Sequence, residues 1–476
     1  MKDLPVSPGR AGLLLLFTGQ MLPMIDASIT NVALDSITQS LGTTPTQLAL
    51  IVALYGVTFA IFLALGSKLG DNYGRRRIML YGVGLFGVAS LLCGIAGSVN
   101  ELLAARTLQG IGAALVVPQI LAILHVTLRG PAHARAISLY GGMGGLAFII
   151  GQMGGGWLVS ADIAGQGWRN AFFINVPICL LVLFFSRHYI PETQSERPSR
   201  IDWQGTALLG GLLCCLLFPM ALGPELHWPW PLQVMLAATL PLGYLLRQGA
   251  LSQQNRGLQP LLPPRLLKLT SIRFGFLIAL LYFSCWSGFM FCMALTLQSG
   301  MGMAPWQSGN SFVAMGTAYF ISALLAPRLI ARYSSGTIML TGIFMLVLGL
   351  LLLMTTLYVL DTRAGALAIA PASVFIGYGQ ALIVNCFYRV SIRDISQNDA
   401  GAASAILTTL QQSAMGLGPA VLGSIFLYLQ HSNGGSYPMA MVGFLAVEVL
   451  MILALGVVTV VRRQALAAVP TVGKSS

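Results

Sequence analysis

The chain alternates between long apolar runs and short polar connections along its whole length. Runs of about 20 apolar residues are long enough to cross the hydrocarbon core of a bilayer as α-helices. The pattern therefore predicts an all-α integral membrane protein with fourteen transmembrane helices. The expected spans lie at about 11–33, 47–67, 78–98, 101–124, 136–159, 169–187, 204–223, 231–247, 273–297, 307–331, 337–358, 363–388, 401–430 and 438–461.

Two longer polar connections, at about 188–203 and 248–272, divide these spans. They enclose a hairpin of two spans, and removing that hairpin leaves six spans on each side. Segment GSKLGDNYGRR after the second span resembles APRLIARYSSG after the tenth, and internal repeats are common in secondary transporters. We therefore expect a six-helix bundle over 1–187, linker loops with an inserted hairpin (204–247) over 188–272, a second six-helix bundle over 273–461, and a tail over 462–476.

The composition agrees with a chain that is largely covered by lipid. Hydrophobic residues make up 56% of the sequence and charged residues 8%, whereas soluble proteins carry roughly 25% charged residues. The net charge of +12 raises the question of nucleic-acid binding. The basic residues form short clusters between apolar runs, with no continuous basic face, so we expect no nucleic acid as a partner.

The basic residues are sorted to one side of the predicted topology. Of the 26 Lys and Arg residues, all except Arg106, Arg169 and Arg363 fall in the tails and the loops on the side of both termini. Because Lys and Arg concentrate in cytoplasmic loops, we expect both termini in the cytoplasm. The expected location is the cytoplasmic (inner) membrane of a bacterium, as a multi-pass protein.

The strongest local motif is GSKLGDNYGRRR at 66–77, between the second and third spans. Its glycines permit a tight turn and a close approach of helices. Asp71 can pair with an arginine or lie at the amino end of a facing helix. Three arginines alone would fit an ordinary cytoplasmic loop, but a lone aspartate between spaced glycines does not.

This segment resembles the G-x-L-x-D-x-x-G-R-[RK] motif of the major facilitator superfamily. Other stretches resemble its fourteen-spanner drug:proton antiporter family, the EmrB/QacA-like multidrug efflux transporters. The matches cover the amino-terminal half in order, and the carboxyl half matches in span number and loop placement. The matching stretches are IDASITNVAL at 25–34, RTLQGIGAA at 106–114, WRNAFFINVP at 168–177 and IDWQG at 201–205.

The resemblance implies the major facilitator fold, in which two six-helix bundles here carry an inserted two-helix hairpin. It also implies a gating role for the motif between spans two and three, formed by Gly66, Asp71, Gly74, Arg75 and Arg76.

The fifth-span motif of this family, G-x-x-x-G-P-x-x-G-G, is altered here. Segment 147–156 reads AFIIGQMGGG, so Ala147 replaces the first glycine and Gln152 replaces the proline. The small residues for close helix packing remain, but the kink that proline introduces is lost. Gln152 either offers a polar contact in the transport pathway or bonds a neighbouring helix.

Three ionisable residues inside the predicted spans are the candidates for proton coupling. A charge at the bilayer centre costs about 2.5–3.5 kcal/mol on insertion scales, so such residues are rarely idle. Asp26 can bind and release a proton, attract a cationic substrate, or make a structural hydrogen bond to a neighbouring helix. The resemblance places Arg106 at the central cavity with a part in proton transfer. Glu448 matches no motif of the family and is either a second proton carrier or a pairing residue.

Polar and aromatic side chains within apolar spans are the candidates for the substrate cavity. Tyr282 and Trp286 lie four residues apart on one helix face, where their rings can hold a cation or pack against lipid and protein. The polar groups either line a wet cavity or bond other helices. The candidates are Asn31, Gln109, Gln152, Tyr282, Trp286, Gln380, Asn385 and Gln412.

These features predict a secondary active transporter, a proton-coupled antiporter that exports amphiphilic or cationic drugs by alternating access. We expect it to work as a monomer, with a small-molecule substrate, protons and membrane lipid as partners. The proton gradient is the expected energy source, with no cofactor. A dedicated exporter or importer of a single metabolite, and a membrane sensor that transports nothing, are the alternatives.

An ATP-driven pump or membrane enzyme is disfavoured. Gly473-Lys474-Ser475 resembles the end of a phosphate-binding loop, but Ala468 stands where the first glycine belongs and no helix follows. The loops carry no nucleophile motif, and the seven cysteines lie within apolar runs without paired spacing. We therefore expect no enzymatic activity and no metal site.

Overall fold

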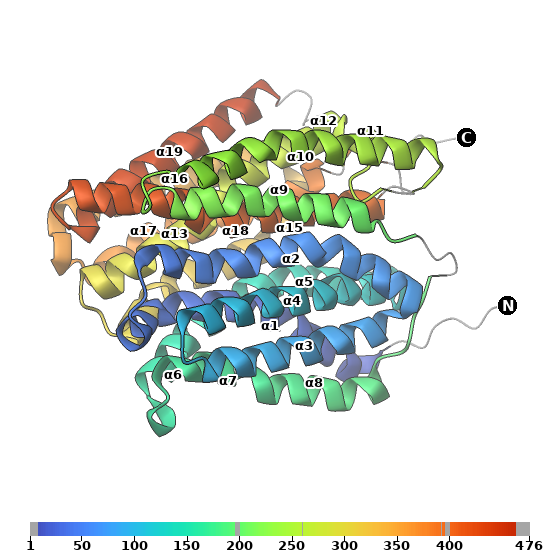
Figure 1. Cartoon of the computed structure of the whole chain (residues 1–476), viewed down its shortest axis with the longest axis horizontal. Coiled ribbons are helices and arrows are strands. Elements are labelled where there is room, and N and C mark those ends of the chain that lie inside the picture. The colour runs from blue at the N-terminus through green and yellow to red at the C-terminus, as the bar shows by residue number, and fades with distance from the viewer. Residues whose placement is uncertain (1–7, 196–199, 259, 392, 396–399, 463–476) are drawn as a thin grey trace.

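The computed structural model describes residues 8–195, 200–258, 260–391, 393–395 and 400–462. Its helices run roughly along one common direction (Figure 1). In this part of the chain, 13 helices are long and apolar enough to cross a membrane, which confirms those expected spans. At the expected fifth span the chain is helical from Gly130 to Ser160, with a shorter apolar helix at Leu146–Ser160. The motif Gly473-Lys474-Ser475 lies outside the described residues.

The amino-terminal half begins with four long helices joined by tight turns. Thr44 starts the second helix with a reciprocal cap, in which its hydroxyl accepts from the Gln47 N–H and the Gln47 side chain accepts from the Thr44 N–H. The elements are α1 (Gly9–Leu41), α2 (Pro45–Tyr73), α3 (Arg75–Ile95), α4 (Val99–Thr127), α5 (Gly130–Ile149), the π-helical η1 (Ile150–Gly154), α6 (Gly155–Ser160), the 3₁₀ turns η2 (Ile163–Gly165) and η3 (Gly167–Arg169), α7 (Asn170–Phe173) and α8 (Asn175–Tyr189).

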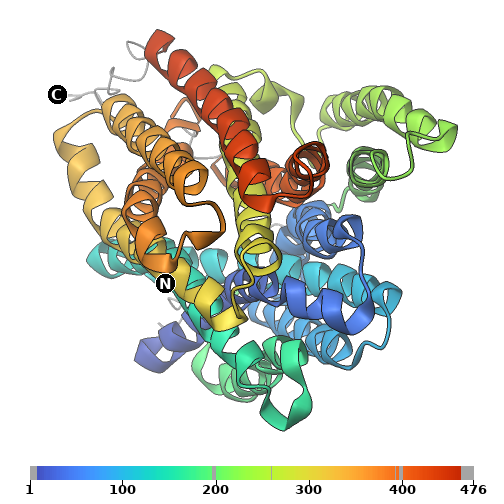
Figure 2. The same ribbon diagram turned by 90° about the vertical axis from the view of Figure 1, so that its left-hand side faces the viewer.

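The inserted hairpin consists of α9 (Trp203–Leu222) and α10 (Trp230–Asn255). Asp202 holds its base together, since its carboxylate accepts hydrogen bonds from Gly205 N, Gln253 Nε2 and Leu261 N at 2.6–2.9 Å. The hairpin lies at the edge of the molecule and packs against α2 and α18 (Figure 2). This cap explains why the segment IDWQG has an aspartate directly before the first residue of α9.

The carboxyl-terminal half contributes most of the largest buried apolar cluster, which also extends into the amino-terminal half, and it contains two further π-helical segments. The short α11 (Pro264–Leu267) leads into it. Its elements are α12 (Thr270–Ile278), η4 (Ala279–Phe283, π-helical), α13 (Ser284–Leu295), η5 (Thr296–Gly300, π-helical), α14 (Pro305–Ser311), α15 (Val313–Arg332), α16 (Ser335–Leu360), the 3₁₀ turn η6 (Asp361–Arg363), α17 (Ala366–Ser391), α18 (Ala400–Ser432) and α19 (Tyr437–Val461).

The two halves meet through small residues and through hydrogen bonds at one end. A Cβ atom on Gly56 of α2 would lie 2.7 Å from the Cα atom of Gly416 of α18, so these backbones touch. At the end away from the α2–α3 turn, Ser299 donates to Asp35 at 2.8 Å and Trp306 N donates to Ser160 at 3.1 Å. In this conformation the halves are therefore closed against each other at that end.

The altered fifth span shows what replaces the missing proline. The five residues of η1, which include Gln152, are π-helical, so the fifth span departs from α-helical geometry here without a proline. Gly151 and Gly155 pack against Ser28 and Ile29 of α1, where a Cβ atom would collide. The prediction that small residues support close packing is confirmed.

Candidate functional site

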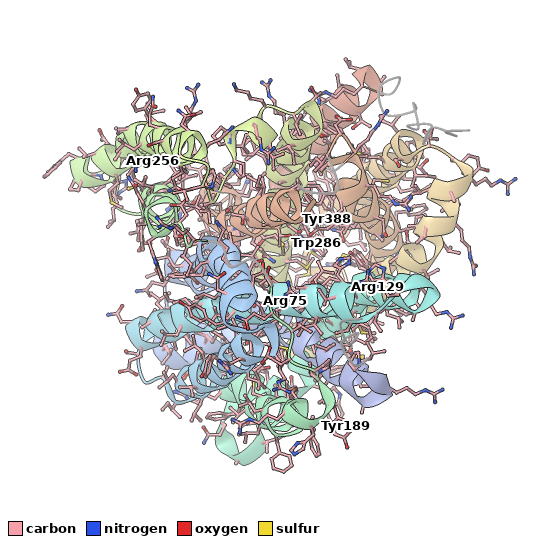
Figure 3. All side chains as sticks on the ribbon, turned by 90° about the vertical axis from the view of Figure 1, so that its right-hand side faces the viewer. Arg75, Arg129, Tyr189, Arg256, Trp286 and Tyr388 are labelled. Atoms are coloured by element: carbon pink, nitrogen blue, oxygen red, sulfur yellow. The ribbon has the colours of Figure 1, made fainter. Side chains whose placement is uncertain are left out.

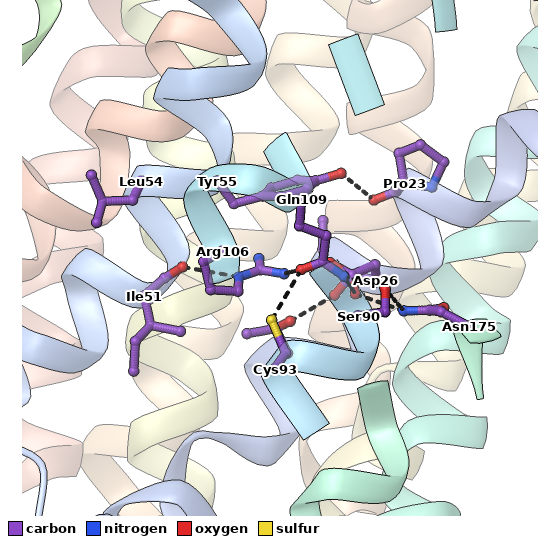
Figure 4. Close-up of polar contacts among 12 residues, drawn as sticks. Pro23, Asp26, Ile51, Leu54, Tyr55, Ser90, Cys93, Arg106, Gln109 and Asn175 are labelled. Atoms are coloured by element: carbon purple, nitrogen blue, oxygen red, sulfur yellow. Dashed lines mark hydrogen bonds and ion pairs between the residues drawn. The ribbon is translucent and has the colours of Figure 1, made fainter. Parts of the chain in front are cut away.

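A buried ion pair joins the first and fourth spans. The Asp26 and Arg106 residues are both 0% exposed. Arg106 Nη1 donates to Asp26 Oδ2 at 2.5 Å, and Arg106 Nε donates to the Ile51 carbonyl of α2 at 3.2 Å (Figure 4). Desolvating two charges is costly unless the geometry is good and further hydrogen bonds satisfy both groups. The surroundings of this pair meet that condition.

Amide side chains complete the coordination of the carboxylate. Gln109 Nε2 and Asn175 Nδ2 both donate to Asp26 Oδ1, at 2.6 and 2.8 Å. The two amides also donate to Ser90 Oγ of α3, at 2.9 and 3.4 Å. Gln109 Oε1 accepts from Arg106 at 2.6 Å. One connected polar network therefore ties α1, α3, α4 and α8 around Asp26.

Close helix packing holds the arginine in place. Its guanidinium carbon lies 4.4 Å from the centre of the Tyr55 ring, a cation–π distance. Gly110, one residue after Gln109, lets α4 approach α2, because a Cβ atom there would lie 2.5 Å from the Tyr55 carbonyl oxygen. The sequence RTLQG thus supplies the charge, the amide and the small residue that this packing needs.

Asp26 and a small cavity lie on opposite faces of α1. Met24 and Ser28 face α5, since Met24 lies beside Gly144 and the Ser28 hydroxyl donates to the Phe148 carbonyl. Asp26 is two residues from each, which places it on the other side of the helix. Helix α1 therefore separates the ion pair from the space beside Gly144 and Phe148.

That space is a small cavity between the halves, with a volume of about 10 Å³, which is room for about one water molecule. Aromatic rings from the second half form much of its wall, because Trp286 and Tyr319 lie with ring centres 5.8 Å apart. Trp286 is near the middle of the view in Figure 3. The lining residues are Gly144, Phe148, Trp286, Met315, Gly316, Tyr319 and Gln380.

Of the predicted cavity residues, the structure brings Trp286 and Gln380 to this cavity. Tyr282 is buried behind them, with its ring centre 6.0 Å from that of Trp286, and its hydroxyl donates to the Gln380 carbonyl at 3.3 Å. The other candidates do not line it. Asn31 and Asn385 donate to carbonyls of their own helices, Gln109 belongs to the ion-pair network, and Gln412 is half-buried on α18.

Gln152 and Glu448 are buried polar groups without the partners that pairing would supply. Gln152 is 1% exposed, and neither atom of its amide has a hydrogen-bond partner among the described residues. Glu448 is 3% exposed, and its Oε2 likewise has none in the described chain. Two predictions are therefore wrong within the described residues: that Gln152 bonds a neighbouring helix, and that Glu448 is a pairing residue.

The motif between spans two and three forms a compact polar junction. Asp71 accepts from Arg75 at 2.6 Å, so it pairs within its own segment. Gly66 lies against the Ala114 carbonyl of α4, where a Cβ atom would collide, and Gln119 donates to the Gly66 carbonyl at 2.7 Å. Gly74 has φ +105°, a conformation that favours glycine.

The loop after α8 completes this junction. The Glu192 carboxylate accepts from the N–H groups of Arg76 and Arg77 at the start of α3, at 2.9 and 3.2 Å. Arg76 also donates to the Arg187 and Ile190 carbonyls at the end of α8. The motif thus fastens the α2–α3 turn to the end of α8.

Three residues of the network and the junction were not predicted from the sequence, namely Ser90, Asn175 and Glu192. Asn175 lies in the matched stretch WRNAFFINVP, and Ser90 is a polar residue within an apolar span. Both features could have identified these residues as candidates. Glu192 lies in a polar loop and had no distinguishing pattern.

A model of the Major Facilitator Superfamily matches residues 16–419. The chain is 31% identical over 434 residues to the probable actinorhodin transporter of Streptomyces coelicolor, covering 90% of this chain and 74% of that protein. It is 30% identical over 416 residues to puromycin resistance protein pur8 of Streptomyces alboniger, covering 87% and 81%.

A third relative is the tetracenomycin C resistance and export protein of Streptomyces glaucescens, 29% identical over 86% of this chain and 74% of that protein. Among solved structures, a crystal structure of peptide transporter POT in complex with sulfate superposes with a TM-score of 0.71 over 97% of both chains. At 13% sequence identity this likeness is one of fold.

Proposed function

Because this chain belongs to the Major Facilitator Superfamily, we propose that it exports amphiphilic, antibiotic-like compounds from the cytoplasm in exchange for protons. The observation that carries the proposal is the fully buried Asp26–Arg106 pair in a multi-pass membrane protein. An ionisable residue inside a membrane span is by default a functional residue. The chain works as a monomer with both termini in the cytoplasm.

The relatives support the proposal that the substrate is an antibiotic-like compound. Their names connect them with actinorhodin, puromycin and tetracenomycin C. The cavity between the halves is walled by Phe148, Trp286, Met315 and Tyr319, and Gln380 provides a polar group. Such a lining suits a molecule with aromatic or other apolar surface and few polar groups, for which the cavity must widen from its size in this conformation.

The coupling runs through α1. A proton on Asp26 removes the negative charge that holds Arg106, so the network around the carboxylate must rearrange. Because the opposite face of α1 contacts α5 beside the cavity, a shift of α1 reaches the substrate side. Proton and substrate thus act on two faces of one helix, and direct competition for the carboxylate is not required.

Transport by purified protein in proteoliposomes tests the function. With an imposed pH gradient, we expect puromycin to accumulate against its own gradient, and dissipating the pH gradient to stop this accumulation. Flux that ignores the pH gradient would contradict antiport. No flux of puromycin or of actinorhodin would favour the sensor or a dedicated metabolite carrier.

Glu448 is proposed as a second proton-binding group. It lies near enough to Tyr282, Cys285 and Cys292 to interact with them electrostatically. Tyr282 in turn donates to the Gln380 carbonyl, and Gln380 lines the cavity. A buried acid without a cationic partner among the described residues is costly as a carboxylate, so a proton would bind there readily.

Replacing Glu448 by Gln is expected to slow gradient-driven export by about 100-fold, the lower end of the effect of losing a proton-transfer group. The amide fills the same space without a buried charge, so thermal stability should be unchanged or higher. Initial rates at several external pH values, together with unfolding midpoints, check this. An unchanged rate and pH profile would exclude Glu448 from coupling, and recovery of the pH profile in Glu448→Asp would support it.

A further inference from the structure

A groove lies on the lipid-facing side between α3 and α8, at the end of the bundle that carries the α2–α3 turn. The volume of the groove is about 680 Å³. The two helices pack closely beneath it, because Gly87 of α3 lies against the Cys179 side chain of α8. Apolar side chains form the part toward the middle of the helices, namely Leu80, Tyr81, Leu85 and Leu183.

The other end of the groove is basic. Arg76, Arg77 and Arg187 line it together with a single acid, Glu192. That acid is already engaged, since it pairs with Arg76 at 3.6 Å and accepts from two N–H groups of α3. The guanidinium groups of Arg77 and Arg187 are exposed, and neither makes a hydrogen bond or ion pair with a described residue. The groove therefore presents two arginine charges that have no partner among the described residues, next to an apolar surface.

We propose that this groove binds an anionic phospholipid, with the phosphate between Arg77 and Arg187 and the acyl chains along α3 and α8. The charge and the apolar lining match the two parts of such a lipid, and basic pockets at the ends of transmembrane helices recognise anionic headgroups. Tyr81 is 64% and Phe184 68% exposed, so this face presents large apolar side chains to the bilayer. The same Glu192 and Arg76 hold the α2–α3 turn, so the lipid would sit directly beside the gating motif.

Lipid binding to the purified full chain, measured by native mass spectrometry with dioleoylphosphatidylglycerol, tests the proposal without relying on transport. The variant Arg77→Gln/Arg187→Gln is expected to bind this lipid about thirtyfold more weakly, from about fivefold for each arginine. The matched control is Arg328→Gln/Arg332→Gln, which removes two exposed arginines at the end of α15 in the other half. It should bind like the wild type, and dioleoylphosphatidylcholine should bind all three weakly.

Three outcomes would overturn the proposal. Equal weakening in both double variants would mean that only the overall positive charge matters. Unchanged binding in Arg77→Gln/Arg187→Gln would place the lipid elsewhere. Displacement of the lipid by equimolar glycerol 3-phosphate would identify a site for soluble anions. Because the substituted side chains are exposed and unbonded to described residues, unchanged unfolding midpoints should accompany the expected result.

Discussion

Asp26→Asn is expected to abolish accumulation of substrate driven by a pH gradient. A gradient of about two pH units supplies about 2.7 kcal/mol for each proton, which corresponds to about 100-fold accumulation for one-to-one exchange. The amide cannot take up the proton, so the variant should reach no accumulation. Measurement of puromycin in proteoliposomes at fixed internal and varied external pH gives this ratio directly.

Exchange without a gradient distinguishes lost coupling from lost folding. Asn occupies the same volume and keeps an oxygen that accepts from Arg106, although the buried Arg106 charge loses its counter-charge and stability should fall. The folded variant should still exchange labelled for unlabelled substrate at equal pH. The matched control is Asp361→Asn, which removes an exposed acid in the η6 turn. If Asp26→Asn accumulates substrate as the control does, Asp26 is not the coupling acid.

The sequence was sufficient for the spans because each one is a local property. A run of about 20 apolar residues must be helical in lipid, where every backbone polar group needs an internal partner. The glycines of 66–77 and 147–156 were informative for a related reason, since close packing of helices requires small residues at fixed positions.

The site could not be predicted in the same way, because it depends on contacts between residues that are far apart in the sequence. Asp26 and Arg106 are 80 positions apart, and Asn175 is 149 positions from Asp26, so only the packed helices bring them together. Gln109 was expected at the cavity, because a polar residue in an apolar span does not reveal which side it faces. The π-helical turns η1 and η4, which contact α1 and α18, were also not predicted, since no local sequence pattern marks them.

Arg106→Gln is expected to cause the largest loss of stability. Removing one partner of a buried ion pair leaves an uncompensated charge and typically costs about 3–5 kcal/mol. Here the Asp26 carboxylate would keep the Gln109 and Asn175 donors but lose its counter-charge, and the Ile51 carbonyl would lose the Arg106 Nε donor. Thermal unfolding in detergent measures the loss, and Arg328→Gln, which removes an exposed arginine of α15, should show almost none.

The double variant Asp26→Asn/Arg106→Gln separates stability from coupling. With both charges gone, no charge is left buried alone, so much of the lost stability should return although the network keeps fewer strong hydrogen bonds. Gradient-driven accumulation should stay absent, because no group in the network then binds a proton. A double variant as unstable as Arg106→Gln would show that the arginine acts mainly through its contacts with Tyr55 and Ile51. A stable double variant that still couples to the gradient would move proton binding away from this pair, with Glu448 as the next residue to test.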